Sequence, residues 1–190
     1  MTPALGVILA GGQARRMGGG DKGRLMLGAH SLIEHVINRL RPQVSRMALN
    51  ANGDPTRFGD LGLPVLADSI ADHPGPLAGV LAGLDWAASQ GAASIVTVAA
   101  DTPFFPRDLV ARLEAAGPLA LAADGNGRHP TFGHWPVALR EDLRDALTSG
   151  QRKIVVWTDS HHAGEAMFPG EDAFFNINTP DDLAAAKGRI

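Results

Sequence analysis

The sequence predicts an α/β protein: a single-domain, three-layer fold built on a mainly parallel β-sheet. Three observations carry this prediction. Apolar runs without strict alternation, such as 4–9 and 94–101, are typical of strands buried on both faces. Apolar residues three and four positions apart, as in 31–42, are typical of amphipathic helices. The two kinds of segment alternate along the chain, and this alternation favours parallel strands joined by helices.

Each predicted strand is a short apolar run that ends at a glycine, a proline or a polar residue. The strongest run is β-branched and ends at Asp101, just before Pro103. The predicted strands cover residues 4–9, 46–50, 64–68, 94–101 and 119–124. A further run, 153–157, is rich in β-branched residues and reads locally as a strand.

The predicted helices carry recognisable start signals. Ser31 is a suitable N-cap, and Glu34 lies three residues later at the capping-box spacing. Thr179 is the expected cap of the final helix, with Pro180 at its first position. The predicted helices cover residues 31–42, 76–89, 106–117, 137–150 and 179–189.

Composition narrows the class of protein. The chain has 190 residues, 45% of them hydrophobic, which suits one core and one domain over 1–190. Its net charge of −3 disfavours nucleic acid as a partner, and the absence of cysteine excludes disulfides and thiolate metal sites. The first apolar run is too short for a secretory signal, and no stretch approaches the roughly 20 apolar residues of a spanning helix. We therefore expect a cytoplasmic protein that binds neither nucleic acid nor membrane.

Polar residues and glycines follow the predicted strands. Gly11 and Gly12 come after the first strand, and Asn50, Asp68 and Asp101 end the next three. In open α/β sheets, ligands bind at the carboxyl ends of the strands, near a switch in strand order. We therefore expect these residues to converge on one ligand site.

The segment 9–23, LAGGQARRMGGGDKG, combines six glycines with three cations. A phosphate cradle needs backbone N–H groups that point inward and cations nearby. A Walker A loop is excluded, because Lys22 is followed by Gly23 rather than Ser or Thr. A formal GxGxxG begins only at Gly18, too far after the strand for a dinucleotide fingerprint. Two hypotheses remain: a long phosphate loop from Gly11 to Lys22, or a flexible loop without a ligand.

The same segment resembles the signature of the molybdenum cofactor guanylyltransferases, which make molybdopterin guanine dinucleotide. They belong to the wider nucleotidyltransferase group that includes the nucleotide-sugar pyrophosphorylases. The resemblance continues, in order, through NAN (50–52), ADSIADHPGPLAG (67–79), AADTPFF (99–105), HPTFG (129–133) and FFNINTPDDL (174–183). The loop alone indicates only the wider group, whereas HPTFG and FFNINTP are more specific. The resemblance implies a nucleotide-diphospho-sugar transferase-like fold, in which 153–157 is helical rather than extended.

The resemblance implies that GMP is transferred from GTP to the terminal phosphate of molybdenum-molybdopterin, with release of pyrophosphate. The attacking phosphate is already ionised, so the reaction needs charge neutralisation and alignment rather than a Ser-His or Cys-His pair. A hard divalent metal, Mg²⁺, supplies part of that charge. Asp101, in the DTP motif, is the implied metal ligand, and Lys22 is the implied contact to the nucleotide phosphates; both are expected to be catalytic.

The GTP site implied by the resemblance comprises Leu9, Ala10, Gly11, Gly12, Arg16, Lys22, Asn50, Asp68 and Asp101. Arg15 is an alternative to Arg16 as the loop arginine that contacts the triphosphate. Other readings stay open. Asp101 could be a turn or cap residue, Lys22 a solvated loop lysine, and Asn50 and Asp68 plain strand ends.

The C-terminal half is expected to hold the pterin, and the N-terminal half the nucleotide. The residues implied in pterin binding are His129, Pro130, Thr131, Arg152, Lys153, Asn176 and Asn178. For Asn178, an Asx-turn or cap ahead of the last helix is an equal alternative. His161 and His162 have neither metal-site spacing nor an acidic partner nearby in sequence, so they are interpreted as surface residues.

Two other functions compete with this one. The first is a cytidylyl- or sugar-phosphate nucleotidyltransferase with the same loop, against which HPTFG and FFNINTP argue. The second is a regulatory module that binds a nucleotide without turnover. The resemblance further implies transient contacts with proteins of molybdenum insertion and molybdoenzyme maturation.

Overall fold

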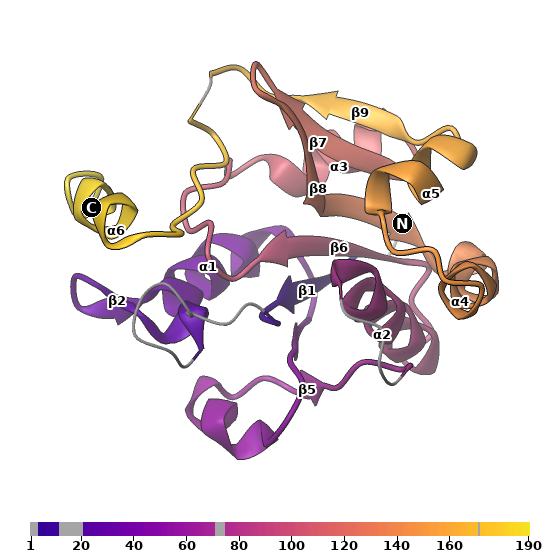
Figure 1. Ribbon diagram of the computed structural model, residues 1–190, viewed down its shortest axis with the longest axis horizontal. Coiled ribbons are helices and arrows are strands. Elements are labelled where there is room, and N and C mark those ends of the chain that lie inside the picture. Colours follow the sequence, from indigo (N-terminus) through magenta and orange to yellow (C-terminus); the bar gives the residue numbers. More distant parts are fainter. Residues whose placement is uncertain (1–3, 12–20, 71–74, 171) are drawn as a thin grey trace.

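The computed structural model describes residues 4–11, 21–70, 75–170 and 172–190, and they form the expected three-layer α/β fold (Figure 1). A seven-stranded sheet with the order β5-β4-β1-β6-β8-β7-β9 forms the middle layer. Its strands are β1 (Leu5–Leu9), β4 (Met47–Asn50), β5 (Val65–Leu66), β6 (Ser94–Ala99), β7 (Ala120–Asp124), β8 (Gly127–Pro136) and β9 (Gly164–Met167). A separate hairpin joins β2 (Met26–Leu27) to β3 (His30–Ser31).

The sheet is mainly parallel, as predicted. The strands β5, β4, β1 and β6 pair in parallel, and β9 pairs in parallel with β7. Only β8 runs in the opposite direction among the strands of this sheet that the structure describes, and it joins β6 to β7. The carboxyl ends of β4, β5, β1, β6, β7 and β9 therefore lie along one edge, and β8 begins there.

Helices cover both faces of the sheet. They are α1 (Leu32–Leu40), α2 (Pro76–Ser89), α3 (Leu109–Ala116), α4 (Arg140–Thr148), α5 (Ile154–Ser160) and α6 (Pro180–Lys187), with short 3₁₀ turns η2 (Lys22–Arg24), η3 (Arg41–Gln43), η4 (Pro55–Leu61) and η5 (Val137–Leu139). Both predicted caps are confirmed: Ser31 and Thr179 each form a capping box, with Glu34 and Asp182 as partners. Within the described residues, no helix is long and apolar enough to cross a membrane.

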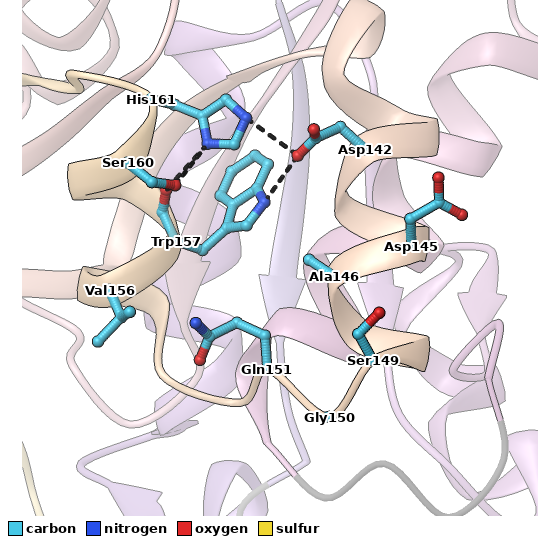
Figure 2. A pocket seen from close by; sticks show the side chains of 10 residues that line it. All are labelled: Asp142, Asp145, Ala146, Ser149, Gly150, Gln151, Val156, Trp157, Ser160 and His161. Atoms are coloured by element: carbon cyan, nitrogen blue, oxygen red, sulfur yellow. Dashed lines mark hydrogen bonds and ion pairs between the residues drawn. The ribbon is translucent and has the colours of Figure 1, made fainter.

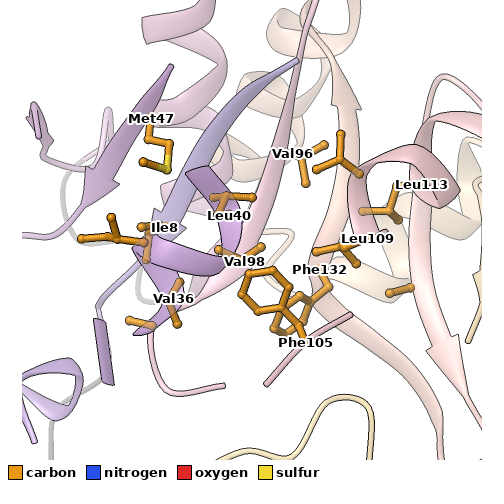
Figure 3. Packing of buried hydrophobic residues seen from close by; sticks show 14 of the residues in the cluster. Ile8, Val36, Leu40, Met47, Val96, Val98, Phe105, Leu109, Leu113 and Phe132 are labelled. Carbon is orange, nitrogen blue, oxygen red and sulfur yellow. The ribbon is translucent and has the colours of Figure 1, made fainter. Parts of the chain in front are cut away.

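Two hydrophobic clusters hold the layers together. On one face, α1 and α3 pack against Ile8, Val96 and Val98 (Figure 3). On the other face, α2, α4 and α5 pack against Val7 and Ile95. Successive side chains of β1 and β6 thus enter opposite clusters. This double burial is the reason that both strands read as continuous apolar runs rather than as alternating ones.

The segment 153–157 shows where local propensity misleads. It forms the start of α5 rather than a strand, as the family resemblance implied. Ile154, Trp157 and Thr158 are buried, whereas Val156 is 49% exposed, so burial follows the helical spacing of three and four residues. Packing of Ile154 and Trp157 into the α2–α4 cluster outweighs the β-propensity of the two valines.

Other element boundaries also differ from the prediction. The predicted strand 64–68 shrinks to two paired residues, and the predicted helix 106–117 becomes regular only at Leu109. The edge strand β9 was not predicted, because GEAM contains a glycine and a charge and has no apolar run.

A bulge distorts β8 at the edge where the other strands end. Leu121 of β7 pairs with Gly133, but the next residue, Ala122, pairs with His129. The residues Pro130–Phe132 are therefore extra on the β8 side. Bulges of this kind redirect side chains and are common beside active sites.

Candidate active site

Lys22 lies at the centre of a cluster of polar side chains from three distant segments. Its ammonium donates to the Asp101 carboxylate at 2.6 Å, to the Asn176 amide oxygen at 3.4 Å and to the Asn178 amide oxygen. Lys22 is only 8% exposed as a whole residue. The structure thus brings the lysine of the glycine-rich loop and two of the predicted pterin residues into one contact group.

Local packing explains how Lys22 reaches this position. It begins the 3₁₀ turn η2, and the next residue, Gly23, lies against the end of β6. A Cβ at Gly23 would lie 3.3 Å from the Cβ of Ala100 and 3.4 Å from that of Ile33. A serine or threonine there, as in a Walker A loop, would crowd this contact.

The segment that carries the asparagines is fastened to the strand edge. The backbone N–H of Ile177 donates to the carbonyl of Asp101 at 2.9 Å, and Ile177 is fully buried. The N–H of Asn178 donates to the carboxylate of Asp182 at 2.9 Å. This bond, first among several, lowers the pKa of Asp182, because it stabilises the charged carboxylate. Asn178 therefore agrees with both interpretations of the sequence: its backbone takes part in the cap of α6, and its side chain contacts Lys22.

A second polar cluster lies at the ends of β4 and β5. The side-chain amide of Asn50 donates to one oxygen of Asp68 at 2.9 Å, and that of Asn52 donates to the other at 2.7 Å. The Asp68 N–H donates in turn to the Asn52 amide oxygen at 2.8 Å. Asn50 is 5% exposed, so it is a buried polar group with a defined partner rather than a solvated strand end.

Gly79 allows this second cluster to form. A Cβ at Gly79 would lie 2.2 Å from the Asn50 amide oxygen and 3.0 Å from Leu9. Sequence reasoning did not assign a role to Asn52 or Gly79. Asn52 lies in NAN (50–52), and Gly79 ends ADSIADHPGPLAG (67–79). Membership in these family-like segments was the only sequence signal for either residue.

The strand β1 connects the two clusters. The N–H of Ala10 donates to the Asn50 carbonyl at 2.9 Å, and the Leu9 carbonyl accepts from Ala100 at 3.1 Å. A Cβ at Gly11 would meet no described atom within 4 Å, so the space beside it is open. Gly12, Arg15 and Arg16 of the predicted GTP site lie outside the described residues.

His129 lies near the start of β8 and contacts an aromatic ring and a buried carboxylate. Its ring stacks on Phe174 with centroids 4.3 Å apart, and its Nε2 lies 2.9 Å from the Asp124 carboxylate. The Asp124 side chain is fully buried. The two groups lie close together without a hydrogen bond between them. Asp124 was not predicted as a site residue; the available signal was a carboxylate at the end of the predicted strand 119–124, where it begins the turn sequence DGNGR (124–128).

Pro130 and Thr131 fall within the β8 bulge that follows His129. Arg152 and Lys153 are exposed, and their backbone N–H groups donate to the side chain of Gln151. No side-chain contact joins these four residues to Lys22 among the described contacts. Their role in pterin binding stays a prediction.

An open depression of about 650 Å³ lies between α4 and α5 (Figure 2), and its lining includes Gln151, which precedes Arg152 and Lys153 in the sequence. Asp142 accepts from the indole Nε1 of Trp157 at 3.0 Å and lies 2.9 Å from Nε2 of His161. The interpretation of His161 as an unpartnered surface residue was therefore wrong. Its acidic partner lies on the preceding helix, and this contact fastens α5 to α4.

The cluster around Lys22 offers one carboxylate to a metal. In the described part of the chain, no group of three or more His, Asp or Glu side chains is placed to hold an ion. The Asp101 carboxylate is a hard oxygen donor, and 21% of its side chain is exposed at the strand edge. It fits a cation of the Mg²⁺ class that takes most of its ligands from substrate phosphates and water.

Comparisons with known proteins show the family of this chain. The MobA-like NTP transferase domain matches residues 6–164. The chain is 54% identical to a molybdenum cofactor guanylyltransferase of Cereibacter sphaeroides over 188 residues, covering 97% of this chain and 96% of the relative. The chain belongs to this family.

Further members and structures extend the match. A molybdenum cofactor guanylyltransferase of Bradyrhizobium sp. is 52% identical, covering 98% of this chain and 92% of the relative. The crystal structure of molybdopterin-guanine dinucleotide biosynthesis protein A from Archaeoglobus fulgidus superposes with a TM-score of 0.73 at 26% identity, covering 97% of both chains. The family resemblance inferred from the loop and from HPTFG and FFNINTP is confirmed, and the chain is a nucleotidyltransferase.

Proposed function

We propose that this protein transfers GMP from GTP to the terminal phosphate of molybdenum-molybdopterin and releases pyrophosphate. The relatives with about half of their residues identical carry this activity in their names. The structural observation that supports it best is the Lys22 cluster. The lysine from the nucleotide loop contacts Asp101 and two asparagines of the FFNINTP segment, so residues expected to serve the two substrates lie side by side.

The chemistry requires little of the side chains beyond charge and alignment. An oxygen of the pterin phosphate attacks the α-phosphorus of GTP, and the bond from that phosphorus to the β-phosphate oxygen breaks. The attacking oxygen is already ionised, so no general base is needed. Lys22 is proposed to stabilise negative charge as pyrophosphate leaves, a role supported by the burial of its ammonium, which strengthens its interaction with an anion.

Mg²⁺ is the metal that we propose for this reaction. Asp101 would hold it together with phosphate oxygens of GTP and water. When bound, the metal neutralises phosphate charge and aligns the triphosphate. In the described structure the Asp101 carboxylate contacts the Lys22 ammonium instead, so the two cations would share this carboxylate or Lys22 would move toward the phosphates.

The first half is proposed to hold GTP along the ends of β4, β1 and β6. The space beside Gly11 is open at the end of β1, while the Ala10 N–H and the Leu9 carbonyl bond to Asn50 and Ala100 and so hold this strand end in place. Asp68 is proposed to accept from N1–H and the amino group of guanine, a donor pair that adenine and cytosine lack. Asn50 and Asn52 hold the Asp68 carboxylate in place for this contact.

The second half of the single domain is proposed to hold the pterin. Asn176 and Asn178 can exchange their contact with Lys22 for one with the substrate, and His129 lies stacked beside their segment. Arg152 and Lys153 are cations near the start of α5 that could meet a phosphate. The cytoplasmic location and the transient contacts with molybdoenzyme maturation proteins stay predictions.

A pyrophosphate-release assay tests the proposal. The enzyme is incubated with molybdopterin, Mg²⁺ and GTP, ATP or CTP in parallel, and the dinucleotide product is identified by mass spectrometry. We expect release with GTP that requires the pterin. Release with CTP instead would favour the cytidylyltransferase alternative. Tight GTP binding without release would favour the non-catalytic module.

A further inference from the structure

A small pocket lies between α1, the segment after Asp101 and the end of α6. Its volume is about 300 Å³, and it contains none of the residues of the two clusters described above. Basic, amide and aromatic side chains line it. They include His35, Asn38, Arg39, Phe104, Arg107 and Arg189. No Asp or Glu side chain is among the described residues that line it.

Two of these arginines form an uncompensated positive charge. Arg39 donates from Nε to the carbonyl of Pro103 at 3.0 Å, which leaves the outer N–H groups of its guanidinium without a carboxylate. Burial, and then the charge of Arg107, lower the pKa of Arg39, because both disfavour its charged form. Among the described ion pairs, neither Arg39 nor Arg107 has an acidic partner. A bound anion would relieve this repulsion.

The rest of the pocket is well ordered by its own contacts. Arg189 pairs with Asp172 at 2.9 Å and lies over the ring of Phe175, 4.3 Å from its centroid. On α1, His35, Asn38 and Arg39 are spaced so that they share one face of the helix. Contacts with Pro103 and Asp172 thus hold Arg39 and Arg189 at the pocket, whereas Arg107 is exposed at its rim.

We propose that this pocket is a second anion site that binds a phosphate-type oxyanion, separate from the Lys22 cluster. Paired guanidinium groups match the oxygens of a phosphate in geometry and charge. The volume is at the lower end for ligand pockets, which suits pyrophosphate or the phosphate of a monoester rather than a whole dinucleotide. The proposal rests on the pocket alone and not on the proposed function.

The walls of the pocket belong to the segments that carry the catalytic cluster. Arg39 holds the carbonyl of Pro103, two residues after Asp101. The Arg189 guanidinium lies over Phe175, the residue before Asn176. An anion bound to Arg39 and Arg107 should therefore reduce hydrogen exchange in 103–110.

Calorimetric titration with inorganic pyrophosphate, without divalent metal and with EDTA present, tests the site. The titration is made in the Lys22→Met variant, so that binding at the catalytic cluster does not contribute. Arg107→Gln is the main variant, because Arg107 is exposed and its loss should not disturb folding. Arg39→Gln is the second. Arg46→Gln is the matched control, since Arg46 is an exposed arginine that donates to Gln90, outside the pocket.

We expect pyrophosphate to bind in the Lys22→Met background and Arg107→Gln to weaken it by roughly tenfold or more, the loss of one charge-assisted contact. Arg46→Gln should leave the affinity unchanged. A parallel titration with GMP distinguishes the sources: tighter binding than pyrophosphate would identify a phosphate monoester with its base against Phe104. The proposal would be overturned if neither Arg39→Gln nor Arg107→Gln changed the affinity for pyrophosphate or for GMP. Binding of an acidic peptide without binding of either phosphate compound would also overturn it.

Discussion

Replacing Lys22 with methionine removes the central charge of the active-site cluster while keeping most of the apolar stem. The ammonium contacts the Asp101 carboxylate at 2.6 Å and two asparagine amide oxygens, in a position where Lys22 is 8% exposed. A hydrogen bond to a charged group contributes about 1.5–3 kcal/mol at such a place. Losing about two such contacts in the transition state raises the barrier by about 3–6 kcal/mol, which slows turnover roughly 10²- to 10⁴-fold.

The same change should also reduce stability. Asp101 would lose its cation, but 21% of its side chain is exposed, so water can compensate in part. We expect the free energy of unfolding to fall by about 1–3 kcal/mol, below the full cost of breaking a fully buried pair. The variant should remain folded at room temperature, because the sheet and both hydrophobic clusters are untouched.

Initial rates of pyrophosphate release at saturating GTP and pterin measure the first effect, and urea unfolding measures the second. GTP binding by calorimetry should weaken as well. Lys187→Met is the matched control, since Lys187 is exposed in the last turn of α6. If Lys22→Met turned over GTP and bound it like the parent, the lysine would be a structural tie between segments, and the phosphate-cradle reasoning would be wrong.

Four further substitutions test the remaining parts of the site. Asp101→Asn should lower Mg²⁺-supported turnover roughly 10²- to 10³-fold with the fold intact, measured by steady-state kinetics; near-normal rates would make Asp101 a turn residue. Asp68→Ala should narrow the preference for GTP over ATP and CTP by about 5- to 150-fold in kcat/KM, and unchanged selectivity would assign guanine reading to the backbone. Gly79→Ala should displace Asn50, destabilising the fold by about 1–3 kcal/mol and weakening GTP binding, whereas a neutral result in thermal unfolding would contradict the 2.2 Å approach. Asp124→Asn should raise KM for the pterin while leaving KM for GTP unaltered; equal changes in both would indicate general loss of structure.

The fold class, and the edge of the sheet at which the parallel strands end, could be predicted because both depend on patterns that are local in sequence. The run at 94–101 and the capping residues Ser31 and Thr179 each contain their own signal, and both capping boxes form as expected. The segment 153–157 has no such signal. Its helix is stabilised by burial of Ile154 and Trp157 against elements far away in the chain, which a local pattern does not contain.

The contacts within the candidate site could not be predicted from the sequence. Lys22, Asp101 and Asn178 could be named from motifs, yet nothing in the sequence indicates that one ammonium contacts both of the others. The partners Asn52 and Asp124 were missed because their importance depends on a carboxylate or an imidazole brought close by the fold. The Asp142–His161 contact was missed for the same reason, since nineteen positions separate the pair.

Along the chain, the last strand of the sheet comes before two of the side chains that contact Lys22. All strands of the central sheet end by Met167, before Asn176 and Asn178 are reached. The bonds from Lys22 to these asparagines join residues that are 154 and 156 positions apart, so they can form only after almost the whole chain has been synthesised. During synthesis, a chain that has emerged only as far as β9 already holds every strand of its sheet but not the amides that surround the lysine. The C-terminal segment therefore completes the polar contacts of Lys22 after every strand of the sheet has been synthesised.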